Sequence, residues 1–260
     1  MFVAHLHKAN LSCSTIRTYL SAIAFQHKIN NMSNPVASFS VSKCLQGVSN
    51  QEKLIESFKK PLKRLPISRE ILHKMIDAIP RVIKNTYLAH MFKTLFLLCY
   101  YASLRAGEAV KSNNLDNVLR MNNFNKVSLN GKPGYRIDFE NFKHSKYPTS
   151  LSLISSGSKN YCPVIALDKY IKMRGGEPGY LFLKSNRKLL TRAHFSTTLR
   201  SCLNVSGYQY QLYNTHSFRI GRTTDLALLK FPEAVIKASG RWKSDAYKKY
   251  IKLNPLRLPC

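Results

Sequence analysis

The most informative part of the chain is the stretch His216-Ser217-Phe218-Arg219, which is followed by Gly240-Arg241-Trp242 and then by Tyr250. Arginine presents a rigid fork of donors that can bind two phosphate oxygens at once. A tyrosine hydroxyl beside such cations ionises more easily than its free pKa of about 10 allows. Phosphate-binding groups followed by a nucleophile predict covalent attack on a phosphodiester of DNA.

The charge of the chain predicts a polyanionic partner. Lysine and arginine number 41 against 13 aspartates and glutamates, a formal net charge of +28 at pH 7. Such an excess gives strong, salt-sensitive and largely sequence-independent affinity for nucleic acid, because bound counterions are released. Charge alone is equally typical of a ribosomal-type or chromatin-coating protein, or of a protein that binds anionic membranes.

The sequence predicts no membrane span, metal site or disulfide framework. The longest apolar stretch, Thr94 to Leu104, is far shorter than the roughly 20 residues that a span needs, and the N-terminus lacks the apolar core of a secretion signal. The six cysteines are scattered and form no Cys-x-x-Cys pair. We therefore expect a soluble, intracellular protein without metal or cofactor.

Residues 1–50 predict a small helical domain. Apolar residues at helical spacing from Ser14 to Lys28 indicate an amphipathic helix, which Ser12 or Ser14 can cap. A second short helix is expected around Val41 to Gln46.

Residues 51–67 are polar and basic and are interpreted as a linker. Its cations cluster at Lys59, Lys60, Lys63 and Arg64. Such a cluster is typical of a nuclear import signal, of a contact with the DNA backbone, or of a linker that is simply solvated.

Residues 68–260 predict a larger domain that is mainly α-helical with one small antiparallel sheet, an α+β arrangement. Ser68 can cap a helix that Pro80 ends, and the apolar stretch from Val82 to Tyr101 is expected to be the central buried helix. The remaining expected elements are strands at Val127–Leu129, Tyr135–Phe139 and Ser150–Ile154, a turn at Asn130–Gly134, and helices at Pro163–Met173 and at Arg192–Leu203 after a Thr191 cap.

Three longer stretches extend the opening pattern: HSFRIG at 216–221, GRWKSDAYKKYI at 240–251, and STIRTYLSAI at 14–23. With them the chain resembles the tyrosine recombinases, and it is most similar to those of DIRS-type retrotransposons and crypton-like transposons. The resemblance spans residues 11–252. It implies a two-domain, C-shaped clamp that closes around duplex DNA, with residues 68–260 as the catalytic domain.

The resemblance also implies roles for the cationic residues. Arg105 and Arg219 correspond to two arginines that bind the non-bridging oxygens of the scissile phosphate, and Glu108 is placed to orient Arg105. Lys146, between the second and third strands, matches a mobile lysine that protonates the leaving 5′ oxygen, with Lys143 as its near rival.

The proton-transfer and nucleophilic roles fall on the C-terminal motif. By the resemblance, His216 hydrogen-bonds the phosphate and assists proton transfer, and Trp242 donates to a phosphate oxygen but cannot act as a base. Tyr250 is the expected nucleophile, whose attack leaves a 3′-phosphotyrosyl bond and needs neither ATP nor metal. Tyr247 is the alternative, although an aromatic residue at that place usually packs inward.

The resemblance implies double-stranded DNA as partner, a homo-tetramer on two duplexes, and a nuclear location. The residues expected to contact DNA are Arg17, Lys59, Lys60, Lys63, Arg64 and Lys243. The small domain begins within what should be its first helix, so an N-terminal truncation is expected.

Some features depart from the family pattern. The step from Trp242 to Tyr250 is one residue shorter than in many bacterial and phage relatives. Tyr147-Pro148 replaces an expected Thr-Asp, and Arg222 and Lys230 stand where small residues or glycine are common.

Three alternative functions stay open. They are a catalytically inactive transposon-derived DNA-binding protein, a type IB topoisomerase, and a generic basic RNA-binding protein.

Overall fold

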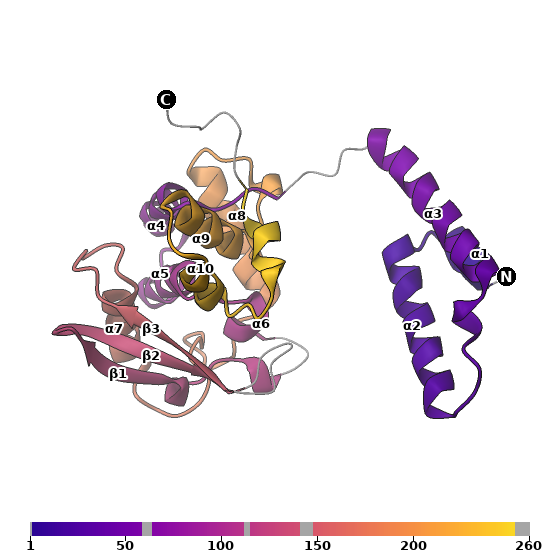
Figure 1. Cartoon of the computed structure of the whole chain (residues 1–260). Coiled ribbons are helices and arrows are strands. Elements are labelled where there is room, and N and C mark those ends of the chain that lie inside the picture. Colours follow the sequence, from indigo (N-terminus) through magenta and orange to yellow (C-terminus); the bar gives the residue numbers. More distant parts are fainter. Residues whose placement is uncertain (1, 59–63, 112–114, 141–147, 253–260) are drawn as a thin grey trace. The chain divides into compact units, whose positions relative to one another are not determined.

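The computed structural model describes residues 2–58, 64–111, 115–140 and 148–252 (Figure 1). The chain divides into two compact units, Met1–Leu62 and Lys63–Cys260, and each is described by itself. Among the described helices, none combines the length and the apolar character that crossing a membrane requires.

The first unit is a small helical unit, as the sequence predicts. Its elements are α1 (Phe2–Lys8), α2 (Cys13–Ile29), a 3₁₀ turn (Pro35–Ala37) and α3 (Phe39–Phe58). The Ser12 side chain caps α2 by accepting a hydrogen bond from the Thr15 amide. The small core that holds the helices together consists of Val3, Cys13, Ile16, Leu20 and Val48.

Helix α3 is longer than the sequence predicts. The short helix expected near Val41 continues to Phe58, so residues 51–58 are helical and do not belong to a linker. The physical reason is that this part of α3 binds the start of α2: the Glu52 carboxylate accepts a hydrogen bond from the Cys13 amide at 2.6 Å. Of the expected linker, residues 59–63 lie outside the described residues.

The second unit is mainly helical. Its helices are α4 (Arg69–Val82), α5 (Thr86–Tyr101), α6 (Ala106–Ala109), α7 (Pro163–Arg174), α8 (Arg192–Val205), α9 (Ser217–Leu228) and α10 (Glu233–Gly240). Ser68 and Thr191 cap α4 and α8, as predicted. Pro80 does not end α4, because the Ile83 amide still donates to Ile79 and completes one more turn.

Helix α5 is the central buried helix, as predicted, but it begins at Thr86 rather than at Val82, because Val82 ends α4 and the Asn85 side chain caps α5 by accepting a hydrogen bond from the Leu88 amide. Its Phe96 ring lies 5.5 Å from the Phe218 ring of α9 and 6.2 Å from the Phe195 ring of α8, centroid to centroid. Because Phe218 immediately precedes Arg219, this packing fixes the first turn of α9 relative to the core.

A three-stranded antiparallel sheet covers one side of the unit, in the order β1 (Phe124–Leu129), β2 (Lys132–Phe139), β3 (Thr149–Ile154) (Figure 1). The prediction of a small antiparallel sheet is confirmed, but its first turn is tighter than expected. Only Asn130 and Gly131 form it, with φ of 52° and 72°, the left-handed pair that a two-residue hairpin requires.

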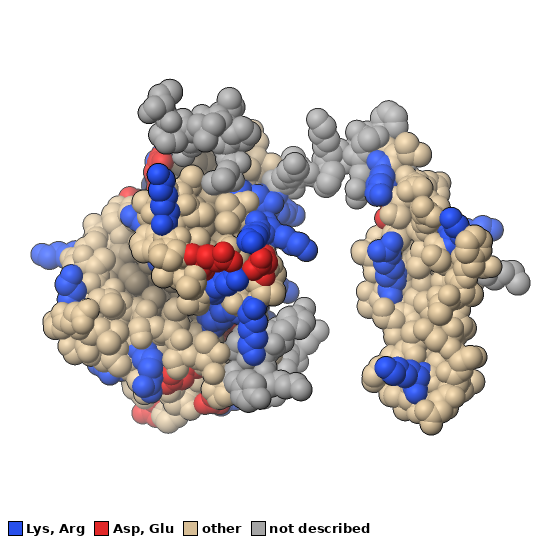
Figure 2. Space-filling model, viewed as in Figure 1, with Lys and Arg blue, Asp and Glu red and all other residues tan. Residues whose placement is uncertain are grey.

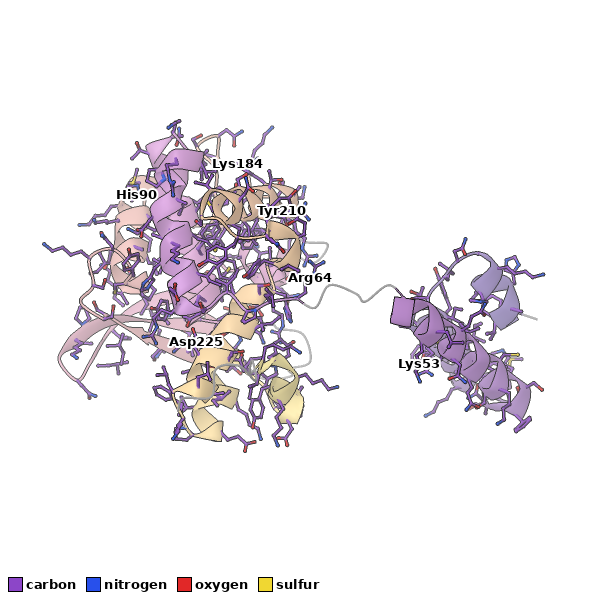
Figure 3. The ribbon with its side chains drawn as sticks, turned by 90° about the horizontal axis from the view of Figure 1, so that it is seen from above. Lys53, Arg64, His90, Lys184, Tyr210 and Asp225 are labelled. Carbon is purple, nitrogen blue, oxygen red and sulfur yellow. The ribbon has the colours of Figure 1, made fainter. Side chains whose placement is uncertain are left out.

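Asp225 of α9 joins three helices of the second unit. Its carboxylate accepts hydrogen bonds from the Arg69 amide, at 2.8 Å, and from the Tyr100 hydroxyl at the end of α5 (Figure 3). Arg222 lies over the rings of Tyr100 and Tyr101. Arg222, which departs from the family pattern, is therefore accommodated by aromatic packing at the end of α5.

Lys230 is the other departure that the structure explains. It lies just past the end of α9 with φ of 56°. This left-handed conformation is the one that glycine most often supplies after a helix, so the position needs a backbone shape rather than a small side chain.

Helix α9 packs closely against the segment that enters the second unit. The Leu65 and Ile67 amides donate to the carbonyls of Leu212 and Ser217 at 2.9 and 3.0 Å. A Cβ atom at Gly221 would overlap the carbonyl oxygen and carbon of Ile67. Gly221 therefore sets the distance between α9 and this segment.

We predict that Gly221→Ala lowers the free energy of unfolding by about 3 kcal/mol, because the overlapping atoms belong to backbone and cannot turn aside. The matched control is Gly176→Ala, where an added Cβ meets nothing within 4 Å, and it should change stability by less than about 0.5 kcal/mol. Chemical denaturation measures both. Equal stabilities of the two variants would contradict the close approach.

Candidate active site

Five of the predicted site residues come together in the second unit. They come from three segments: the turn into α6, the start of α9, and the stretch from the end of α10 through a 3₁₀ helix (Asp245–Tyr250). The residues are Arg105, His216, Arg219, Trp242 and Tyr250, with Glu108 against the first of them. Lys146 and its rival Lys143 lie outside the described residues.

Arg219 is the centre of this cluster and is fully buried. Its Nη1 donates to the carbonyl of Ser103 and its Nη2 to the carbonyl of Gly240 at 3.1 Å, while Nε has no partner in the described part of the chain. Its guanidinium carbon lies 4.7 Å from the Trp242 ring and 5.8 Å from the Tyr250 ring.

The charge of Arg219 is surrounded by other positive charges. Burial, and then the charges of Arg105 and Arg241, lower its pKa to about 10. That value is far above neutral pH, so the guanidinium stays protonated. A buried cation that binds carbonyls and lies near aromatic rings is a ready partner for an anion.

Glu108 accepts two hydrogen bonds from Arg105. Its Oε1 accepts from the guanidinium Nη1 and its Oε2 from the backbone amide, both at 2.9 Å. The carboxylate is buried, with 4% of its side chain exposed, whereas Arg105 keeps 29% exposed. This contact holds the Arg105 guanidinium on one side and leaves the rest of the side chain accessible to a ligand.

His216 lies beside the proposed nucleophile, with its ring centroid 4.9 Å from that of Tyr250. Desolvation in the site, and then the charges of Arg219 and Arg105, lower the pKa of His216 to about 4. The residue also keeps exposed surface, so its effect on stability is small. At neutral pH the imidazole is neutral and can accept a proton.

Trp242 is half-buried, and its ring lies 5.0 Å from the Tyr250 ring. A Cβ atom at Gly240 would overlap the Trp242 ring. The glycine of the Gly-Arg-Trp motif is thus required because the indole lies directly against it.

The two tyrosines of the motif differ in their surroundings. Tyr247 is buried with Leu226 and Ile236 in a small apolar cluster, so its expected inward packing is confirmed. Tyr250 is half-buried and contacts His216, Trp242 and Arg219. The two residues lie one turn apart, yet only Tyr250 faces the cationic cluster.

The backbone of Tyr250 is anchored by a residue that the sequence did not single out. The Thr224 hydroxyl of α9 donates to the Tyr250 carbonyl at 3.3 Å and accepts from the Lys252 amide at 3.1 Å. Arg241 and Ser103 were also missed. Arg241 lies inside the motif, but nothing in the sequence indicates that its side chain points inward; Ser103 contributes a carbonyl, which has no sequence signal.

The residues expected to contact DNA are less fully described. Arg17 is exposed on α2, and Lys243 is exposed next to Trp242. Arg64 donates to the Gln211 carbonyl at 2.6 Å, which ties the entering segment to the second unit (Figure 3). Lys59, Lys60 and Lys63 lie outside the described residues. Figure 2 shows lysines and arginines over both units, several of them together on one side of the second.

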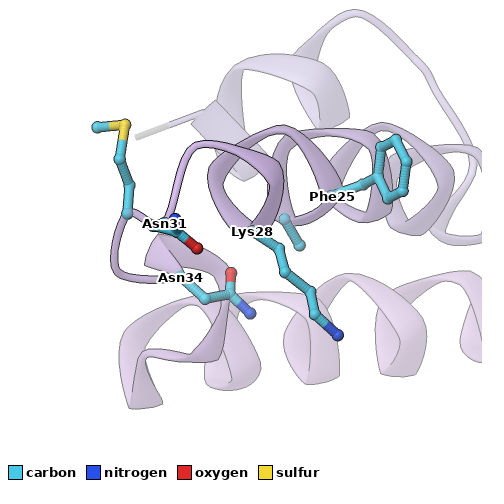
Figure 4. Close-up of a pocket in the computed structure, with 6 residues that line it drawn as sticks. Phe25, Lys28, Asn31 and Asn34 are labelled. Atoms are coloured by element: carbon cyan, nitrogen blue, oxygen red, sulfur yellow. The ribbon is translucent and has the colours of Figure 1, made fainter.

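A surface pocket at the end of α2 is a weaker candidate for an active site. It is lined by Ala24, Phe25, Lys28, Asn31, Met32 and Asn34 (Figure 4). Lys28 is the one charged group among these lining residues, and none of them is a nucleophile or a general base at neutral pH.

No protein-family model and no curated protein sequence matches the chain. Solved structures do match it. A XerH site-specific recombinase bound to palindromic difH, in a post-cleavage complex, is 16% identical with a TM-score of 0.56, covering 76% of this chain and 51% of that one. The chain thus spans about half the length of XerH.

Two further structures cover nearly all of the chain. The Tn1549 transposon integrase in complex with circular intermediate DNA is 15% identical with a TM-score of 0.56, covering 97% of this chain and 79% of that one. A lambda integrase dimer bound to a core site is 14% identical with a TM-score of 0.51, covering 96% and 75%. The mainly helical unit with its three-stranded sheet has the tyrosine recombinase catalytic fold.

We predict that His216 titrates far below the usual pKa of about 6.5, with a midpoint near 4. Because folding lowers the pKa, the unfolded chain takes up the proton first as pH falls. His216 therefore disfavours the folded state as pH falls from about 6.5 toward 4 and has no such effect at neutral pH. NMR titration of the imidazole signals, assigned with His216→Asn, measures the midpoint. A midpoint at 6 or above would contradict the desolvation and the nearby positive charges described for His216.

Proposed function

We propose that this chain cleaves and rejoins DNA strands through a 3′-phosphotyrosyl intermediate, with Tyr250 as the nucleophile. The observation that carries the proposal is the contact of the Tyr250 ring with Arg219, a buried cation whose protein partners are carbonyls and rings. A phosphodiester that gains negative charge during attack is an anion that this guanidinium can bind.

The net charge of the site supports the same reaction. Arg105 and Arg241 both bind the carboxylate of Glu108, and the charges of these two arginines lower the pKa of Arg219, so positive charge is concentrated in the cluster. In this mechanism Arg105 and Arg219 bind the non-bridging oxygens and stabilise the pentavalent transition state. A lysine cannot replace either arginine fully, because it lacks the planar fork.

The proton movements follow from the neighbours of Tyr250. Its hydroxyl oxygen forms a bond to phosphorus and loses its proton to neutral His216, while the bond from phosphorus to the 5′ oxygen breaks. The leaving oxygen takes a proton, in this proposal from Lys146. The phosphotyrosyl bond conserves the energy of the original bond, so attack by a free 5′ hydroxyl reverses the step without ATP.

Arg219 has no exposed surface in the free chain. A phosphate therefore reaches its guanidinium only after side chains over it move. The Trp242 and Tyr250 rings lie 4.7 and 5.8 Å from that guanidinium carbon. DNA binding would then couple the opening of the site to the placement of the nucleophile.

The wider assignment is that of a site-specific recombinase of a mobile element. The XerH, Tn1549 and lambda structures are DNA complexes, and this supports duplex DNA as the partner of this chain. The likeness of residues 240–251 to DIRS-type and crypton-like enzymes supports a transposon origin, a nuclear location and a homo-tetramer that exchanges strands between two duplexes.

We predict that Tyr250→Phe abolishes the covalent adduct with nicked suicide duplexes drawn from DNA that flanks the coding sequence, because it removes the attacking oxygen. Tyr247→Phe is the matched control and should retain adduct formation within about threefold, since Tyr247 packs in the apolar cluster. Denaturing gels measure the adduct. An adduct that still forms with Tyr250→Phe would contradict the proposal. Wild-type protein that binds the duplex but forms no adduct would favour the inactive DNA-binding alternative.

A further inference from the structure

Arg241 is a buried arginine that contributes charge to the site but has no step of its own in the proposed reaction. It follows α10 with φ of 57°, a conformation that is unfavourable for any residue with a side chain. Its side chain is 1% exposed. A buried, charged residue with a left-handed backbone conformation is stable only where its contacts offset both costs.

The contacts of the Arg241 guanidinium reach three other segments. Nη2 donates to Glu108 Oε2 at 2.6 Å, and Nη1 donates to the Ala102 carbonyl at 3.3 Å. Its guanidinium carbon lies 3.7 Å from the centre of the Phe139 ring. These distances describe a side chain in tight contact on several sides.

Two of the contacted residues, Ala102 and Glu108, lead to the arginines of the proposed reaction. Ala102 precedes Ser103, whose carbonyl binds Arg219, and Glu108 binds Arg105. Phe139 ends β2, at the entry to the connection that carries Lys146 in the sequence. On the other side, the backbone of Arg241 leads directly into Trp242.

The shared carboxylate has an electrostatic consequence. If Glu108 were paired with Arg105 alone, the two charges would cancel, and the exposed arginine would have little net charge left for a phosphate. With Arg241 on its other oxygen, the trio of one carboxylate and two guanidiniums carries a net positive charge. Glu108 can then orient Arg105 without neutralising it.

We propose that Arg241 is a positioning residue for strand cleavage: it holds Glu108, and through it Arg105, together with Trp242 and the end of β2 in one arrangement. This inference rests on the proposed function. Arg241 is too buried to touch DNA in this arrangement, so it acts through Arg105 and Trp242.

The test uses three variants of the full chain. Arg241→Gly keeps the left-handed backbone free of strain but removes the charge, and it should slow adduct formation by about 100-fold. Arg241→Lys keeps the charge and should lose about 10-fold. The double variant Arg241→Gly with Glu108→Gln removes the unbalanced carboxylate and should recover to within about 10-fold of wild type.

The matched control is Arg174→Met, which removes another buried arginine. Arg174 binds the carbonyls of Gly175, Glu177, Tyr180 and Leu181, and none of its described partners belongs to the site. It should lower thermal stability without changing the rate of adduct formation by folded protein. The fluorescence of Trp242, the single tryptophan of the sequence, reports on the site directly.

In Arg241→Gly the emission of Trp242 should shift to longer wavelength, and in Arg174→Met it should not. The inference is overturned if Arg241→Gly cleaves within threefold of wild type, or if its loss only follows the unfolded fraction with unshifted emission. If wild-type protein forms no adduct, the proposed function fails by itself. The emission of the two variants then decides the positioning role: a shift confined to Arg241→Gly supports it, and equal emission overturns it.

Discussion

The constraint on which the site depends is the burial of positive charge among carbonyls, rings and the carboxylate of Glu108. Arg219 has no exposed surface and is bound by the carbonyls of Ser103 and Gly240. Arg105 and Arg241 share the carboxylate of Glu108. Desolvating cations is costly, so this arrangement is stable only where packing enforces it, and it favours an anionic ligand.

Close packing in the rest of the second unit holds these arginines in place. Gly221 allows α9 to lie against Ile67, and Phe218 packs on α5, so the start of α9 cannot shift. Gly240 leaves room for the Trp242 ring. The turn after α5 points the Ser103 carbonyl at Arg219. The cationic cluster is thus assembled from segments far apart in the sequence by the core that surrounds it.

Much of the fold was predictable because its signals are local. Hydroxyl caps at Ser12, Ser68 and Thr191, together with apolar periodicity, located the helices, and the motif around Arg219 and Trp242 located the site. What could not be predicted depends on tertiary contacts. The extension of α3 to Phe58 rests on Glu52 binding another helix, and the inward turn of Arg241 depends on a carboxylate 133 residues away.

The most direct measurement is to locate the nucleotide in a trapped covalent adduct by mass spectrometry. Trypsin cleaves after Lys243, Lys248 and Lys249, so Tyr247 falls in the peptide 244–248 and Tyr250 in the peptide 250–252. After nuclease digestion of the adduct, the nucleotide mass should be on the peptide that contains Tyr250. Its presence on the Tyr247 peptide, or on a serine, would contradict the placement of the nucleophile over Arg219.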